Sequence, residues 1–365
     1  MIFRRFYDDA LAQASYLIGC EKTREAVVID PNLATETYLS AAARDGVRIT
    51  HVTETHIHTD FASGARALAA DTGAELHVSG ERGDGWRYGY LAEPGVHALH
   101  DGDRMTVGSV HMDVMHTPGH TPEHLAFLVT DDTRTPLPLG AVTGDFIFVG
   151  DVGRPDLLER AAGEAGSMRA AAADLYRSVQ RFKTLPDYLQ IWPGHGAGSA
   201  CGKAMSSASQ STLGYERIAN WALQPMSETD FVDHVLEGQP AAPPYFGAMK
   251  RRNRDGQLGP RGSLPRNVSC AALAAARGDQ IVVLDVRNRD EWARGHIEDA
   301  ILVPLPELHN RLSEIPQDRT IVVQCHLGAR STVGAATLDA FGFDDVHNLV
   351  GGIAAWEAEG HPIIR

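Results

Sequence analysis

The chain has 365 residues, 43% hydrophobic and 22% charged, which is an ordinary composition for a globular protein long enough for two domains. The formal net charge of −14 argues against a nucleic-acid-binding protein, because no broad basic surface is expected. No run approaches the ~20 apolar residues of a membrane span, and the N-terminus lacks the apolar stretch of a signal peptide. The four cysteines are too few and too scattered for a disulfide framework. We therefore expect a cytoplasmic protein with reduced thiols and neither a nucleic-acid nor a membrane partner.

The first two thirds of the chain predict strands and helices that bring polar motifs into the loops. Continuous apolar runs indicate buried strands, and amphipathic segments indicate helices. Ser227 and Asp230 have the spacing of a helix start. We expect strands up to residue 31 and at 48–55, 105–115 and 125–130, and helices at 34–44, 62–72 and 165–182.

Residues 241–266 have the composition of a linker, since they contain several prolines and a basic run at 250–254. We expect a first domain at 1–240 and a second at 267–365. The basic run is interpreted as a solvated linker face, with contact to an anionic substrate as the alternative. The second domain alternates strands and helices, which predicts a parallel sheet. Its expected strands are 280–285 and 319–324, and its helices are 290–294, 306–315 and a segment from residue 330.

Three short motifs in the first domain have the residue types of a metal site. They are Thr55-His-Ile-His-Thr-Asp60, His116-Thr-Pro-Gly-His120 and Thr143-Gly-Asp145. A histidine pair on one loop, a third histidine in a Pro-Gly turn and an aspartate after a glycine can complete a mononuclear site. Two histidines and one carboxylate with open positions suit a non-haem Fe(II) that binds O2. The alternative, satisfied structural histidines, does not explain two such tight motifs.

The first motif resembles the Thr-His-x-His-x-Asp-His loop of the metallo-β-lactamase superfamily, whose fold is an αββα sandwich. The last histidine of that loop binds a second metal in dinuclear members, and Phe61 stands at its position here. This departure and the segment 144–156 resemble the mononuclear branch, the persulfide dioxygenases. The resemblance implies that one Fe(II) per chain is bound by His56, His120 and Asp145. It also implies that three further groups support these ligands or position the substrate, namely His58, Asp60 and His195.

Other positions bear on the substrate. Arg154 matches a family arginine that holds the carboxylate of glutathione persulfide, a role that suits the guanidinium fork. The alternative is a structural ion pair with Asp151 or Asp156. The His-Asp-Tyr motif of glutathione-using members reads His-Gly-Ala at 195–197, so the tyrosine contact is absent. Cys201 is a candidate sulfur relay, with a small buried structural cysteine as the alternative.

Cys325 lies between the apolar strand 319–324 and the helix that is expected from Arg330. Backbone N–H groups at such a helix start stabilise an anion and favour a thiolate. Gly328 allows a tight turn, and Arg330 closes the loop. A lone cysteine at the end of a strand is usually structural, but the full Cys-x-x-Gly-x-Arg-Ser pattern favours chemistry.

The segment 267–365 resembles the rhodanese family in its cysteine loop and in four further motifs, at 284–287, 291–292, 295–297 and 349–356. The resemblance implies an α/β domain in which Cys325 and Arg330 are catalytic. His326 stands where many members carry arginine, which favours a thiol persulfide over thiosulfate as donor. The implied substrate-binding residues are His326, Leu327, Gly328, Ala329 and Ser331.

These features predict a persulfide dioxygenase joined to a rhodanese sulfurtransferase. The first domain would oxidise a low-molecular-weight thiol persulfide, such as glutathione persulfide, with O2 to sulfite. The second would exchange sulfur among thiosulfate, sulfite and persulfide, which together serve sulfide detoxification. A homo-oligomer is expected. The alternatives are a dizinc thioester hydrolase of the glyoxalase II type and a sulfur carrier that does not oxidise.

Overall fold

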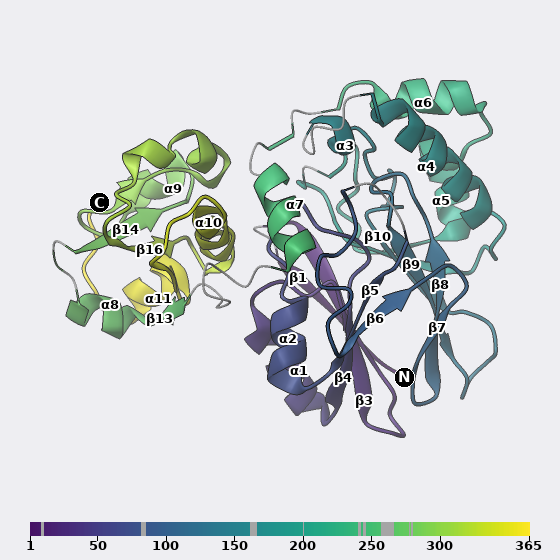
Figure 1. The fold of residues 1–365 in the computed structure, drawn as a ribbon, viewed down its shortest axis with the longest axis horizontal. Helices are drawn as coiled ribbons and strands as arrows, with labels where there is room; N and C mark the ends of the chain where they lie inside the picture. The colour runs from purple at the N-terminus through teal and green to yellow at the C-terminus, as the bar shows by residue number, and fades with distance from the viewer. Residues whose placement is uncertain are drawn as a thin grey trace. The chain divides into compact units, whose positions relative to one another are not determined.

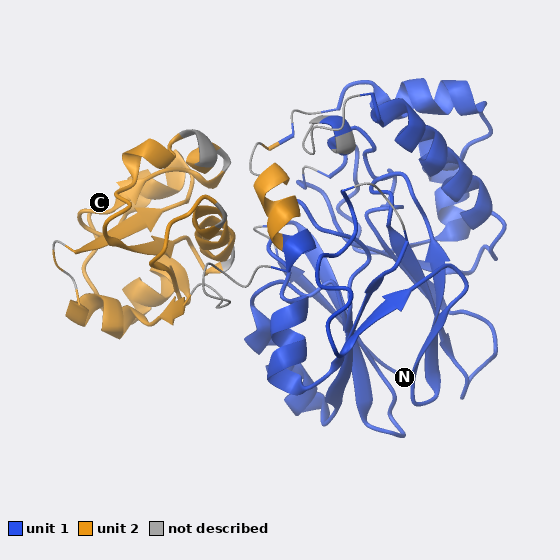
Figure 2. Cartoon of the chain, viewed as in Figure 1, with its two compact units in different colours: residues 1–242, 253–256 blue, residues 243–252, 257–365 orange. Residues whose placement is uncertain are grey.

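The computed structural model forms two compact units, which Figure 2 shows in different colours. The first unit contains Met1–Ala242 and Asn253–Gly256, and the second contains Pro243–Arg252 and Gln257–Arg365. The structure describes residues 1–365 except 9–10, 82–84, 161–165, 200, 240–241, 244–245, 257–265, 277 and 279. In this part of the chain, no helix is both long enough and apolar enough to cross a membrane.

The first unit is built on two six-stranded sheets (Figure 1). One has the order β1-β2-β3-β4-β5-β6, in which the pairs from β3 to β6 are parallel. The other has the order β12-β11-β10-β9-β8-β7. The strands of the first sheet are β1 Ile2–Asp8, β2 Gln13–Gly19, β3 Glu25–Ile29, β4 Arg48–Thr53, β5 Glu75–Ser79 and β6 Val96–Leu99. Those of the second are β7 Arg104–Val107, β8 Val110–His116, β9 Leu125–Asp131, β10 Gly140–Gly144, β11 Gln190–Pro193 and β12 Ser211–Thr212.

Three apolar clusters hold these sheets and their helices together. Side chains such as Val27 and Phe127 fill the space between the sheets. Tyr38 and Leu68 lie on helices that pack against the outer face of the first sheet. Leu175 lies on a helix that packs against the second sheet. The layers therefore form the expected αββα sandwich. Its helices are α1 Thr35–Asp45, α2 Ala65–Thr72, α3 Leu157–Arg160, α4 Met168–Phe182, α5 Leu213–Ala219, the 3-10 helix η1 Trp221–Leu223 and α6 Glu228–Leu236.

The second unit contains a five-stranded sheet of order β13-β17-β16-β14-β15, in which every pair is parallel, as predicted. Its strands are β13 Arg266–Val268, β14 Ile281–Asp285, β15 Ile301–Leu302, β16 Thr320–Gln324 and β17 Val346–Leu349. Its helices are α8 Cys270–Ala276, α9 Arg289–Arg294, α10 Ala329–Ala340 and α11 Gly352–Ala358. The helix expected at 306–315 is instead two short 3-10 helices, η2 Leu305–Asn310 and η3 Leu312–Glu314, the first with a proline in its opening turn.

The stretch expected to be a linker contains a helix, α7 Phe246–Asp255. The expectation that its basic run forms a solvated face is wrong for two residues, because Lys250 and Arg252 are buried. Within the second unit, Arg252 forms an ion pair with Asp339. A buried guanidinium needs a partner of opposite charge, and Asp339 supplies it.

Candidate functional site

The candidate metal ligands of the first unit follow the ends of different strands. His56 comes after β4, His120 lies in the turn between β8 and β9, and Asp145 follows β10 directly. The ends of these strands meet at one edge of the sandwich, so the three side chains converge although they are far apart in the sequence. All three are buried, at 1% exposure each.

The three side chains present free ligand atoms to one another. Oδ2 of Asp145 lies 3.4 Å from Nε2 of His120 and 3.9 Å from Nε2 of His56. Within the described residues, Nε2 of His56 and both carboxylate oxygens of Asp145 have no hydrogen-bond partner. Unpartnered buried polar atoms are costly, so atoms that converge in this way need a shared partner. A metal ion fits this donor set of two imidazoles and one carboxylate.

Hydrogen bonds orient both imidazoles. Nδ1 of His120 donates to the carbonyl oxygen of Arg154 at 3.2 Å, which leaves its Nε2 lone pair for a metal. Nδ1 of His56 contacts Oγ1 of Thr55 at 2.9 Å, and that hydroxyl donates to Asp30 at 2.9 Å. Burial lowers the pKa of His56 well below its ordinary value and also lowers the pKa of His120. Both rings are therefore held neutral, which is the form that binds metals.

Sequence reasoning missed three residues that support this group. Asp30 accepts from the backbone N–H of Thr55 at 2.6 Å, and its carboxylate lies 3.1 Å from Nε2 of His58. Glu123 accepts from the N–H of Ile57 at 2.8 Å. His124 accepts from the N–H of Asp145 at 3.1 Å, and its ring stacks on His56 with centroids 5.0 Å apart. The available signals were an aspartate directly after an apolar strand and an acid–histidine pair close behind the second motif.

The residues expected to support the ligands form a second group beside them. Nε2 of His195 lies 3.1 Å from Asp60 and 3.4 Å from Asp145, and its Nδ1 donates to the carbonyl of Ala12 at 2.9 Å. Asp60, His195 and Cys201 also present ligand atoms within 4.8 Å of one another. Burial raises the pKa of the Cys201 thiol to about 12, so this cysteine is protonated at neutral pH. The structure thus places Cys201 beside His195 and Asp60, next to the group of His56, His120 and Asp145.

Two positions show how closely the chain approaches the metal group. Phe61 is buried, and its ring packs against His58 with centroids 4.3 Å apart. A Cβ atom at residue 194 would lie 2.7 Å from Oδ1 of Asp145, so only glycine leaves room for this carboxylate. The backbone that follows β11 therefore lies against Asp145, and the ring of Phe61 lies beside His58.

Arg154 is fully buried and forms a bidentate ion pair with Asp156. Nε donates to Oδ1 at 2.9 Å, and Nη2 donates to Oδ2 at 2.8 Å. The other aspartate considered from the sequence, Asp151, instead accepts from the N–H groups of Lys203 and Ala204 and from the Trp221 indole. Of the two ion pairs considered, the structure contains the one with Asp156.

In the second unit, Cys325 follows the central strand β16 and precedes α10, as predicted. The N–H of Gly328 donates to its Sγ at 3.1 Å, and Oγ of Ser331 lies 3.5 Å from the same sulfur. Gly328 has φ 108°, a conformation that favours glycine and turns the loop into the helix. The sulfur therefore accepts a backbone hydrogen bond at the start of a helix.

The other predicted loop residues differ in exposure. Leu327 and His326 are exposed, and Ala329 is the first residue of α10. Arg330 is tied to Glu291 by two hydrogen bonds of 2.7 and 2.6 Å. The hydrogen bonds from Arg330 bring the pKa of Glu291 down to about 2. Glu291 was recognised only as part of a motif, and the structure makes it the partner of the predicted catalytic arginine.

Comparison with known proteins divides the chain in the same way. The model of the metallo-beta-lactamase superfamily matches residues 8–195, and the model of the rhodanese-like domain matches residues 269–359. A solved metallo-beta-lactamase from Staphylococcus aureus subsp. aureus COL is 40% identical, with a TM-score of 0.73. That alignment covers 95% of this chain and 98% of the other, so the likeness extends over both domains.

Two curated relatives resemble the first domain and carry different functions. Hydroxyacylglutathione hydrolase of Rhodospirillum rubrum is 33% identical over 49% of this chain, and the alignment spans only 60% of that protein. The mitochondrial persulfide dioxygenase ETHE1 of Homo sapiens is 28% identical over 53% of this chain and 68% of its own length. The two relatives are therefore similarly close to this chain, and sequence identity does not distinguish between their two functions.

Proposed function

The chain belongs to the metallo-β-lactamase superfamily and carries a C-terminal rhodanese-like domain, and on this premise we propose that it is a persulfide dioxygenase joined to a sulfurtransferase. The first domain would convert a thiol persulfide, O2 and water to the thiol and sulfite. This reaction balances, because the outer sulfur gains three oxygens, two from O2 and one from water. The substrate class is a low-molecular-weight thiol persulfide such as glutathione persulfide.

The observation that carries the proposal is the donor set of His56, His120 and Asp145. Two imidazoles and one carboxylate with unpartnered atoms form the ligand type of mononuclear Fe(II) sites that use O2. Phe61 stands where dinuclear members of the superfamily have a histidine, which argues for one metal. A bound Fe(II) would supply the redox chemistry that O2 requires. The similarity to a persulfide dioxygenase supports the same interpretation.

We assign the remaining side chains to support and positioning. Thr55 and Asp30 fix the ring of His56, and the carbonyl of Arg154 fixes the ring of His120. His58 and the Asp60–His195 pair lie around the group and are proposed to position the substrate. Gly196 and Ala197 stand where glutathione-using relatives have aspartate and tyrosine, so the tyrosine contact with the substrate is absent. We therefore expect several persulfides to be accepted. Cys201 remains a proposed sulfur relay.

The second domain is proposed to transfer a sulfane sulfur through Cys325. The Cys325 thiolate attacks the outer sulfur of thiosulfate, an S–S bond forms on the protein, and sulfite leaves with the electron pair of the broken bond. The N–H of Gly328 points at this sulfur and would stabilise its negative charge, and Oγ of Ser331 lies 3.5 Å from it. His326, Leu327 and Ala329 complete the proposed substrate loop, and Arg330 is held at its edge by Glu291. In reverse, sulfite from the first domain would accept the sulfur and leave as thiosulfate.

Metal analysis coupled to O2 uptake tests the proposal. After anaerobic purification, we expect one iron per chain and O2 consumption with glutathione persulfide. Cys325→Ser should abolish sulfur transfer from thiosulfate, because a hydroxyl cannot form the persulfide. It should leave O2 uptake intact, because the metal ligands lie in the first unit. Asp145→Ala is the converse variant and should lose iron and O2 uptake while sulfur transfer persists.

A second candidate, thioester hydrolysis with two zinc ions, is favoured by one specific observation. Asp60, His195 and Cys201 form an additional donor group beside the first. The likeness to a hydroxyacylglutathione hydrolase points the same way. Two zinc ions per chain, hydrolysis of a glutathione thioester and no O2 uptake would replace the first proposal with this one.

A further inference from the structure

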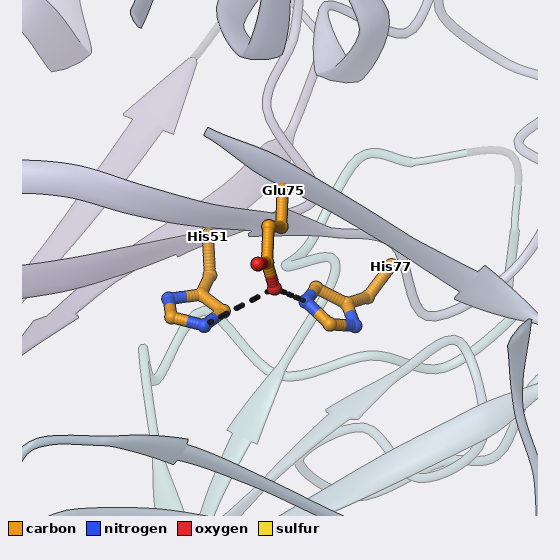
Figure 3. Close-up of side chains that lie close together, drawn as sticks. All are labelled: His51, Glu75 and His77. Atoms are coloured by element: carbon orange, nitrogen blue, oxygen red, sulfur yellow. Dashed lines mark ion pairs between the residues drawn. The ribbon is translucent and has the colours of Figure 1, made fainter. Parts of the chain in front are cut away.

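A histidine cluster in the first unit lies outside the group of His56, His120 and Asp145. His51 lies on β4, Glu75 and His77 on β5, and His97 on β6. In the parallel sheet, His51 is opposite Glu75 and His77 is opposite His97. Residues two apart on β5 face the same side, so the four side chains gather on one face of the sheet. Figure 3 shows His51 and His77 on either side of the Glu75 carboxylate, toward which both rings turn.

The distances match those of a metal group. Oε2 of Glu75 lies 3.5 Å from Nε2 of His77 and 3.9 Å from Nε2 of both His51 and His97. The ligand atoms of His51, Glu75 and His77 all lie within 4.8 Å of one another. Zinc bonds of ~2.0–2.2 Å in a tetrahedron place nitrogen and oxygen ligands about 3.4 Å apart. These distances are close to the 3.4 and 3.9 Å of the His56–His120–Asp145 group.

His77 supplies an independent indication of a ligand. Its side chain is only 11% exposed, and neither ring nitrogen has a hydrogen-bond partner among the described residues. An unsatisfied buried polar group is destabilising, so this arrangement calls for an explanation. A cation that accepts the lone pair of Nε2 would provide it.

The protonation of these rings also suits a metal. The hydroxyl of Thr50 contacts Nδ1 of His51 at 2.9 Å. This contact orients the ring so that its Nε2 faces Glu75. Burial and the neighbouring imidazoles lower the pKa of His77 to about 4, and burial lowers the pKa of His51. Neutral rings are available as ligands at physiological pH.

We propose that His51, Glu75 and His77, joined by His97, bind a divalent first-row transition metal ion, for which zinc is the best match. Imidazole nitrogens with one carboxylate are ligands that zinc prefers, and alkaline-earth ions would require more oxygens. Glu75 and His97 are exposed, so an ion can reach the cluster from solvent. The bound ion would link β4, β5 and β6. This site is separate from the proposed oxidation chemistry and does not depend on it.

Anomalous scattering locates the ion directly. Crystals of the full chain, loaded with iron under anaerobic conditions and then soaked in zinc chloride, are measured on both sides of the zinc absorption edge. We expect a zinc peak bonded to Nε2 of His51 and of His77. Zinc found only at His56, Asp60 or Cys325 and their neighbours would overturn the proposal.

Zinc titration of the full chain gives a second measurement with a matched control. Glu75→Gln combined with His97→Gln removes two exposed ligands, so the fold is expected to survive, which thermal unfolding checks. Zinc should bind this variant at least about ten-fold more weakly than the parent, in line with the effects of altering metal-site residues. His100→Gln removes a nearby exposed histidine outside the cluster and should leave zinc binding unchanged. Equal zinc affinity in all three proteins would contradict the proposed site.

Discussion

Arg154 and Asp156 neutralise each other inside the first unit, with neither side chain exposed to solvent. The same arginine offers its carbonyl oxygen to Nδ1 of His120. The ion pair therefore fixes the backbone that orients the imidazole of His120, a proposed metal ligand. This arrangement makes Arg154 a structural support of the metal group, and a role in substrate recognition has to be separated from that support by experiment.

Arg154→Ala is expected to destabilise the fold. It removes one side of the buried ion pair with Asp156, which typically costs about 3–5 kcal/mol. Urea unfolding of the metal-free protein measures the change in the free energy of unfolding. Arg4→Ala is the matched control, because it removes another bidentate arginine–aspartate pair, that with Asp45, at an exposed position. The control should cost far less, because exposed ion pairs contribute little to stability. Unchanged stability of Arg154→Ala, with KM for glutathione persulfide raised ten-fold or more, would instead identify Arg154 as the carboxylate-binding residue.

Asn253 is predicted to hold in place the loop that follows β4 and carries His56 and His58. Its Nδ2 donates to the carbonyl oxygens of His58 and Phe61 at 2.8 Å each, and its Oδ1 accepts from the N–H of Ser63 at 3.0 Å. Asn253→Ala leaves three backbone groups without this partner and should cost at least about 2 kcal/mol of the free energy of unfolding. Iron content after dialysis should fall as well. Arg254→Ala, on the next residue, should change neither quantity, and equal behaviour of the two variants would contradict the role of Asn253.

Asp30→Asn tests the orientation of the histidine ligands. The carboxylate accepts from the N–H and hydroxyl of Thr55 and pairs with His58, and an amide cannot accept at both oxygen positions. Losing such supporting contacts weakens metal binding about 10–100-fold. Competition with a chelator measures iron affinity, and Asp113→Asn, which alters an exposed ion pair, is the control. An unchanged affinity in Asp30→Asn would show that the ligands are oriented without this network.

Glu291→Gln probes the cysteine loop through its pH dependence. The pKa of Glu291 is held at about 2, so the pair with Arg330 stabilises the native state above about pH 4.5, and the stabilisation is lost as the pH falls toward 2. The pair is partly exposed, and we expect it to contribute about 1 kcal/mol at pH 7. The difference in unfolding free energy between parent and variant should therefore shrink on acidification through this window. Sulfur transfer from thiosulfate should also slow, because Arg330 loses its anchor. Glu357→Gln, which alters an exposed pair with Arg365, should affect neither.

Motifs that depend on neighbouring residues were predictable from the sequence. The loops with the candidate metal ligands lie after strands, and Cys325 lies between β16 and α10. Ser227 caps the N-terminus of α6, where its hydroxyl accepts from the N–H of Asp230. Each of these features depends on local spacing, which the sequence displays directly. The αββα layers and the parallel sheet of the second unit followed from the family resemblances and the strand–helix alternation.

Features that depend on the pairing of distant strands were not predictable. Asp30 supports Thr55 because β3 and β4 lie side by side in parallel. Asn253 is 192 residues from Phe61, and no spacing rule connects them. The histidines at 51, 77 and 97 come from three adjacent strands, and their separation in the sequence has no recognisable period. In each case the contact is created by the pairing of strands in the sheet, or by a late segment of the chain that packs against the first unit.

The return of Asn253–Gly256 to the first unit has a consequence for how the two domains can be separated. The boundary expected from proline content, near residue 240, would sever the metal loop from the asparagine that ties down its carbonyl groups. The first unit is therefore discontinuous in the sequence, and part of the expected linker belongs to it. Any exchange of domains among related proteins would have to keep Asn253–Gly256 with residues 1–242, because a recombination point at residue 240 would separate the first unit from part of its own scaffold.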